Sequence, residues 1–112
     1  MSEVTIAQLE ARKEELKQLA ELSAVHERLV QNPDFRELIL NRFMKLDCAR
    51  YAQESADPLL TPAQRADALA MAQAAGHLKR YLHITHLLST SVMNDVNDID
   101  DEIQRMRAEG AV

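Results

Sequence analysis

The sequence is poor in the residues that form turns and aromatic cores. Its 112 residues include two glycines, three prolines, two tyrosines, two phenylalanines and no tryptophan. All-β folds need turn residues at every hairpin, so this scarcity argues against that class. The abundant alanine, leucine, glutamate, glutamine and arginine are helix formers. We therefore predict an all-α fold with a core of aliphatic residues and methionine.

Cysteine and long apolar runs are also scarce. The single Cys48 cannot form an internal disulfide, which fits a reducing compartment, and its apolar neighbours predict a small core residue. No apolar run approaches the roughly 20 residues that a membrane span needs. The first residues lack the basic-then-apolar pattern of a secretion signal. We expect a cytoplasmic protein with no membrane partner.

The charge of the chain is negative and unevenly distributed. The formal net charge is −5, which disfavours a general nucleic-acid binder, because such proteins need a cationic surface. Residues 92–112 contain six acidic and two basic residues, whereas residues 32–56 contain four of each. The acidic excess therefore lies near the end of the sequence.

Prolines divide the chain into three predicted helices. Asn32 and Thr61 are good N-caps, and each precedes a proline that suits the first helical position. Gln64 stands where a capping box places Glu or Gln. The predicted helices span about residues 5–31, 33–56 and 62–108 of a single domain, 1–112.

These lengths predict an antiparallel helical hairpin or bundle with a coiled-coil-like C-terminal extension. We favour one unbroken third helix that ends near Gly110, with a break near Ser89–Asn94 as the alternative. Gly76 is costly inside a helix, and we expect a bulky neighbour, Phe43 or Phe35, to lie against it.

Apolar stripes on the first and third helices look longer than one small core can bury. The stripe of the third helix has the 4-3-4-3 spacing of a heptad seam. We therefore predict a homo-oligomer that also contacts other structural or assembly proteins. The predicted interaction residues are Leu9, Leu16, Leu19, Leu22, Val92, Val96, Ile99, Ile103 and Met106.

Residues with catalytic or metal-binding chemistry form no recognisable motif. His83 and His86 lie three apart, but no Asp or Glu occurs between Asp67 and Asp95 to complete a zinc site, so we interpret the pair as packing. The acids of residues 95–102 lack the glycine and loop of an EF-hand, and we interpret them as a solvated or docking face. We predict no catalytic residue, cofactor or metal, and a protein that is not an enzyme.

A regulatory or nucleic-acid-associated module is the alternative function. It would use the basic residues of the second helix, although nearby acids largely cancel their charge. Those basic residues are Arg36, Arg42, Lys45 and Arg50.

Residues 30–88 resemble small helical virion and assembly proteins of tailed bacteriophages. The shared pattern is an Asn-Pro-x-Phe opening, an aliphatic helix, a second proline break and a Gly-x-x-Lys-x-Tyr-Leu segment. The resemblance implies a virion or head-assembly component that works by repeated protein contacts, and it implies no catalytic residues. The matching positions are Pro33, Phe35, Ile39, Gly76, Lys79, Tyr81 and Leu82.

Overall fold

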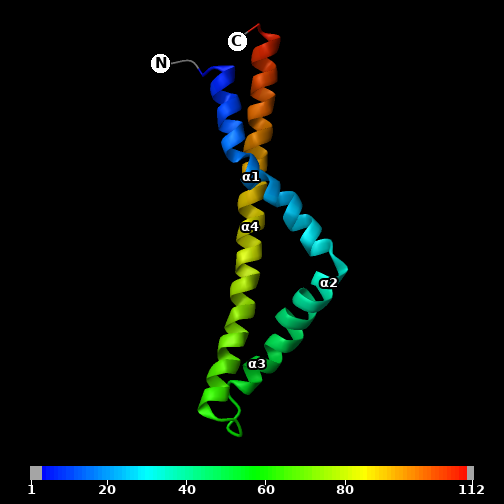
Figure 1. The fold of residues 1–112 in the computed structure, drawn as a ribbon, viewed down its shortest axis with the longest axis vertical. Helices are drawn as coiled ribbons and strands as arrows, with labels where there is room; N and C mark the ends of the chain where they lie inside the picture. Colours follow the sequence, from blue (N-terminus) through cyan, green and yellow to red (C-terminus); the bar gives the residue numbers. More distant parts are fainter. Residues whose placement is uncertain (1–3, 111–112) are drawn as a thin grey trace. The chain divides into compact units, whose positions relative to one another are not determined.

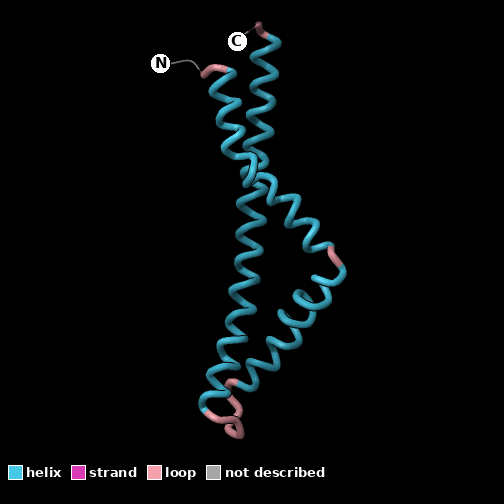
Figure 2. Tube along the Cα trace, viewed as in Figure 1, coloured by secondary structure: helices cyan, strands magenta, loops and turns pink. Residues whose placement is uncertain are grey.

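Helices make up nearly all of residues 4–110, which are the residues that the computed structural model describes (Figures 1 and 2). No strand occurs within those residues, so the predicted all-α fold is confirmed. α2, η1 and α3 follow one another without a loop, and they form the predicted second helix. The elements are α1 (Ile6–Gln31), α2 (Pro33–Phe35), η1 (Arg36–Asp47), α3 (Cys48–Glu54) and α4 (Pro62–Ala108).

Side-chain caps fix the helix starts that the sequence predicted. The Asn32 side chain accepts hydrogen bonds from the backbone N–H groups of Asp34 and Phe35, at 2.9 and 3.0 Å. At α4, the Thr61 hydroxyl accepts from the backbone N–H of Gln64, and the Gln64 side chain accepts from the backbone N–H of Thr61. This reciprocal capping box satisfies amide groups that have no partner within the helix.

α4 is a single helix of 47 residues. The Ser89 hydroxyl donates to the carbonyl of His86 at 3.2 Å, so this buried polar group is satisfied within the helix. Gly110 adopts φ 79°, and its N–H bonds to the carbonyl of Arg107 at the end of the helix. The favoured unbroken helix and its end near Gly110 are therefore confirmed.

Gly76 lies in open space rather than against a bulky side chain. A Cβ added there would have no contact within 4 Å, so the predicted packing of Phe43 or Phe35 on this glycine is wrong. A helix of this length tolerates one glycine because its neighbours on both sides maintain the hydrogen-bond ladder.

Replacing Gly76 by alanine should raise the free energy of unfolding by about 0.5–1 kcal/mol, because alanine loses less backbone entropy and meets no neighbour. Urea denaturation followed by circular dichroism measures the change. The reverse substitution at the exposed Ala74 is the matched control and should destabilise by a similar amount. A loss of stability in Gly76→Ala would contradict the open surroundings of this position.

η1 changes which residues of the second helix face inward. Its backbone N–H groups bond to carbonyls five residues earlier, so each turn takes more residues than an α-helical turn. Phe35, Ile39 and Phe43 are half-buried, as predicted for the inner face. A uniform period of 3.6 residues would place Leu38 and Leu46 on the same face, but both are mostly exposed. The wider turn accounts for the difference.

The chain forms two compact units, which are treated separately below. The terminal unit contains Met1–His26 and Thr85–Val112, and the central unit contains Glu27–Ile84. α1 and α4 each continue from one unit into the other. The units are defined by contacts and not by how they unfold, so the single domain stays a prediction.

The central unit contains the hairpin predicted across the second proline turn. Ala68 and Ala75 of α4 are buried, and the Cys48 thiol of α3 donates to the carbonyl of Ala72 at 3.7 Å. Small side chains on α4 allow α3 to lie close to it. Cys48 is half-buried at this contact, in keeping with a packing role.

Candidate interaction surfaces

The two helical segments of the terminal unit run antiparallel (Figure 1). Side-chain contacts connect them toward both ends of the pair. Near the chain ends, Lys13 pairs with Asp100 at 2.6 Å, and Glu10 pairs with Arg107 at 2.6 Å. At the other end of the pair, the ring of His26 stacks on that of His86 with centroids 4.6 Å apart. These contacts fix the register of α1 against α4.

Small residues lie near the His26–His86 end of this helix pair. Ala20 and Ser23 of α1 and Ser89 of α4 are all buried, and Ser89 has no exposed surface. Toward the other end of the pair, Ile6 and Ile103 are buried. The pair therefore combines small buried residues near the histidine stack with aliphatic packing nearer the chain ends.

Most of the predicted interaction residues are buried or half-buried. Val92 and Ile103 are only 7% and 4% exposed, so the expectation that they form an open seam is wrong. Leu22 is the one member of the set that is largely exposed. The physical reason is that α1 covers the heptad seam of α4. The half-buried members are Leu9, Leu16, Leu19, Val96, Ile99 and Met106.

The large exposed apolar residues of α4 lie on a different face. Tyr81, Ile84, Leu87 and Leu88 are between 43% and 67% exposed. The predicted interaction residues did not include them. The signal that could have identified a further apolar face is the spacing of Tyr81, Ile84 and Leu88, which lie three and then four residues apart.

The histidines do not converge on a metal site. Both His83 and His86 are exposed, and the ring of His86 also stacks on that of His26. Within residues 4–110, no group of three or more His, Cys, Asp or Glu side chains could hold a metal ion. His86 therefore contributes to the packing of α1 on α4, as interpreted from the sequence, and His83 does not.

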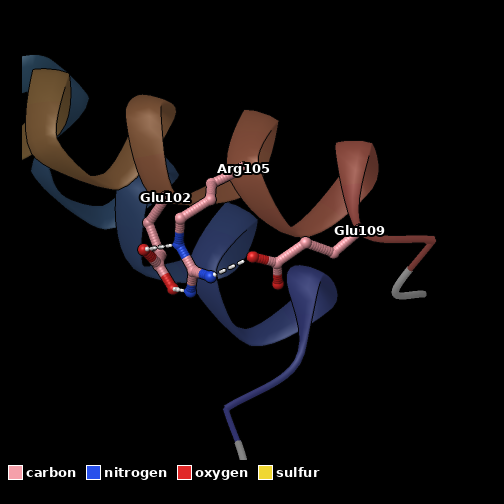
Figure 3. A network of polar contacts seen from close by, with 3 residues as sticks. All are labelled: Glu102, Arg105 and Glu109. Atoms are coloured by element: carbon pink, nitrogen blue, oxygen red, sulfur yellow. Dashed lines mark hydrogen bonds and ion pairs between the residues drawn. The ribbon is translucent and has the colours of Figure 1, made fainter.

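Arg105 neutralises part of the acidic charge near the end of α4 (Figure 3). The Arg105 guanidinium donates to both Glu102 and Glu109, and the contact with Glu109 is 2.7 Å. Hydrogen bonds from Arg105 lower the pKa of Glu102, and the same carboxylates raise the pKa of Arg105. All three side chains are solvent-accessible, so this network adds little to stability.

Charge is segregated between the two units and along α4. The terminal unit has 11 acidic and 5 basic residues, whereas the central unit has 7 acidic and 8 basic residues. Residues 68–94 of α4 contain Lys79, Arg80 and no acid. Beyond them, Asp95 and Asp98 are exposed and form no salt bridge with any described residue. α4 therefore carries separate basic and acidic segments.

Two of the basic residues of the second helix, Arg42 and Arg50, lie within salt-bridge distance of acids. Arg50 contacts Asp47 at 3.7 Å and Glu54 at 2.8 Å, and Arg42 lies 4.0 Å from Asp47. The hydrogen bond with Glu54 raises the pKa of Arg50, and its guanidinium also lies over the Tyr51 ring. Two of the four basic residues of the alternative nucleic-acid face are thus already neutralised.

Two of the open hollows of the central unit share Lys45 in their lining. One hollow has a volume of about 360 Å³ and is lined by four apolar residues and two lysines. The apolar residues are Val30, Leu40, Met44 and Leu82, and the lysines are Lys45 and Lys79. The other, of about 510 Å³, lies beside the turn between α1 and α2 and is lined partly by Arg36, Glu37 and Lys45. Neither brings together a nucleophile with a base.

None of the helices described, within residues 4–110, is both long and apolar enough to cross a bilayer. Comparison of the chain with protein-family models, curated proteins and solved structures finds no match.

Proposed function

We propose that this chain is a non-enzymatic helical assembly protein that acts through self-association and contacts with other proteins. The observation that carries the proposal is the imbalance between its buried and exposed apolar residues. Only six hydrophobic residues are buried in the described chain, and three of them are alanines. Thirteen large hydrophobic residues are exposed, from 37% at Met93 to 91% at Leu59, so apolar surface remains open to a partner.

The helical architecture supports the same proposal. The terminal unit is a pair of helical segments, and two packed helices bury only the stripe where they meet. The remaining faces of α1 and α4 still carry Leu22, Val25, Leu87 and Leu88 in exposed positions. Association with further helices would remove these side chains from water, at roughly 25 cal/mol for each Å² of apolar surface.

A solution mass measurement tests self-association directly. Light scattering after size-exclusion chromatography, at tens of micromolar protein, should give at least twice the 12.7 kDa mass of one chain. Diluting the sample should shift the mass toward that of one chain, because association depends on concentration. A mass of 12.7 kDa throughout this range would contradict the proposal.

The resemblance of residues 30–88 to tailed-bacteriophage proteins supports a narrower form of the proposal. In that form, the assembly is a virion or head-assembly component built by repeated protein contacts. Its test is whether the purified chain co-assembles with virion structural proteins in a sedimentation assay. Failure to sediment with them would contradict the virion or head-assembly role. Self-association would then still be tested by the mass measurement.

A further inference from the structure

The smaller hollow of the central unit, of about 360 Å³, combines an apolar lining with two lysines, and we call it the lysine hollow. Its four apolar residues are all half-buried, whereas both lysines are exposed. The hollow therefore has an apolar floor and cationic groups toward solvent, as lysines give when their stems cover apolar surface. Its lining residues, all within the central unit, are Val30, Leu40, Met44, Leu82, Lys45 and Lys79.

The two lysines of this hollow are not neutralised by acids. No carboxylate lines the hollow, and neither Lys45 nor Lys79 forms a salt bridge with another residue of 4–110. Lys13, by contrast, pairs with Asp100. Unpaired ammonium groups beside an apolar surface suit a ligand that carries an anionic group on an apolar body.

The π-helical geometry of η1 brings Lys45 to the lysine hollow. η1 contributes Leu40, Met44 and Lys45, which are residues i, i+4 and i+5. In an α-helix of 3.6 residues per turn, residue i+5 lies about 140° around the axis from residue i. The wider turn of η1 moves residue i+5 back toward the face of residue i. π-helical turns are rare and frequently occur at functional sites, which favours a binding role for the hollow that η1 lines.

We propose that the lysine hollow binds the anion of a medium-chain fatty acid. The alkyl chain lies against the apolar lining, and the carboxylate pairs with the ammonium groups of Lys45 and Lys79. A volume of about 360 Å³ is near the lower end of the range for small-molecule sites, roughly 300–1,000 Å³. An amphipathic helix would instead need a longer groove that accepts anchors at i, i+3 or i+4 and i+7. The proposal goes beyond self-association, because one chain supplies the whole lining.

Calorimetric titration with decanoate, kept below its micelle concentration, tests the proposal. Decanoate should bind at one site per chain. Octanoate should bind about 10-fold more weakly, because two methylene groups fewer contact the apolar lining. Decyltrimethylammonium has the same alkyl chain with the opposite charge and should not bind measurably. Absence of decanoate binding, or equal binding of the anionic and cationic probes, would overturn the proposal.

Charge-removing substitutions test the role of the two lysines. The double variant Lys45→Gln/Lys79→Gln should weaken decanoate binding about 10-fold, because each exposed ion pair contributes modestly. Lys17→Gln/Arg80→Gln is the matched control, since it removes the same net charge from exposed positions that do not line the hollow. Circular dichroism verifies that both variants keep their helix content. Equal dissociation constants for the two double variants would place decanoate elsewhere and overturn the proposal.

Two further results would identify a different occupant and also overturn the proposal. Binding to phosphatidylglycerol vesicles without binding to decanoate would identify a membrane surface. A decanoate affinity that falls as the protein is concentrated would show that a second copy covers the hollow. The mass measurement decides self-association alone, because decanoate binding is expected for a monomer and for an oligomer alike.

Discussion

Replacing Ile103 by alanine is expected to lower the free energy of unfolding of the terminal unit by about 2–5 kcal/mol. Ile103 is 4% exposed and is one of only three buried hydrophobic residues larger than alanine in the described chain. Truncation removes its transfer free energy and leaves a cavity that a pair of straight helices cannot readily fill. With so few large buried residues, the loss of one should separate α1 from the distal part of α4.

Hydrogen exchange read by mass spectrometry localises the effect. Amides of α1 before His26 and of α4 after Thr85 should exchange faster in Ile103→Ala. Amides near Ala68 and Ala75 should change little, because they belong to the central unit. Met93→Ala is the control, since Met93 lies on an exposed face of the same helix, and it should change stability by less than about 0.5 kcal/mol. Equal effects of the two variants would contradict the burial of Ile103.

The helices could be predicted because their signals are local. Asn32 and Thr61 each carry a capping side chain that acts within three residues, and the structure shows both caps formed. The unbroken α4 also followed from local pattern, since no residue between Pro62 and Ala108 ends a helix outright. Such features need no knowledge of what lies beside the helix.

The partners of the helix faces could not be predicted in the same way. The Val92–Met106 stripe is apolar whether α1 or another chain covers it, so its spacing alone does not identify the neighbour. The neighbour is fixed by contacts between residues far apart in sequence, such as Lys13 with Asp100 and His26 with His86. Tertiary packing therefore determines which apolar face of α4 is buried.

Two further errors have separate physical causes. A uniform helical period of 3.6 would place Leu38 and Leu46 inward, but η1 has a longer period, for which the sequence gives no recognised signal. A packing partner was expected for Gly76 because glycine is costly in a helix, yet the structure leaves its surroundings empty. The low helix propensity of glycine predicts that Gly76 destabilises the helix, but it does not predict whether a packing partner offsets that loss.

Replacing Asn94 by proline is expected to destabilise the chain by about 3 kcal/mol or more. Asn94 is exposed near the middle of the C-terminal half of α4, so its side chain contributes little to the core. Proline removes the backbone hydrogen bond from residue 94 to the carbonyl of residue 90 and clashes with that carbonyl. The break would separate Val92 from Ile103, the two buried hydrophobic residues of α4 in the terminal unit.

Asn94→Ala is the matched control, because it removes the same side chain and favours the helix. Urea denaturation and circular dichroism should show lower stability and lower helix content for the proline variant and slightly higher stability for the alanine variant. Hydrogen exchange should be faster on both sides of residue 94 in Asn94→Pro alone. If the two variants had equal stability, the helix would already be interrupted near Ser89–Asn94 in solution, and the continuous α4 would be refuted.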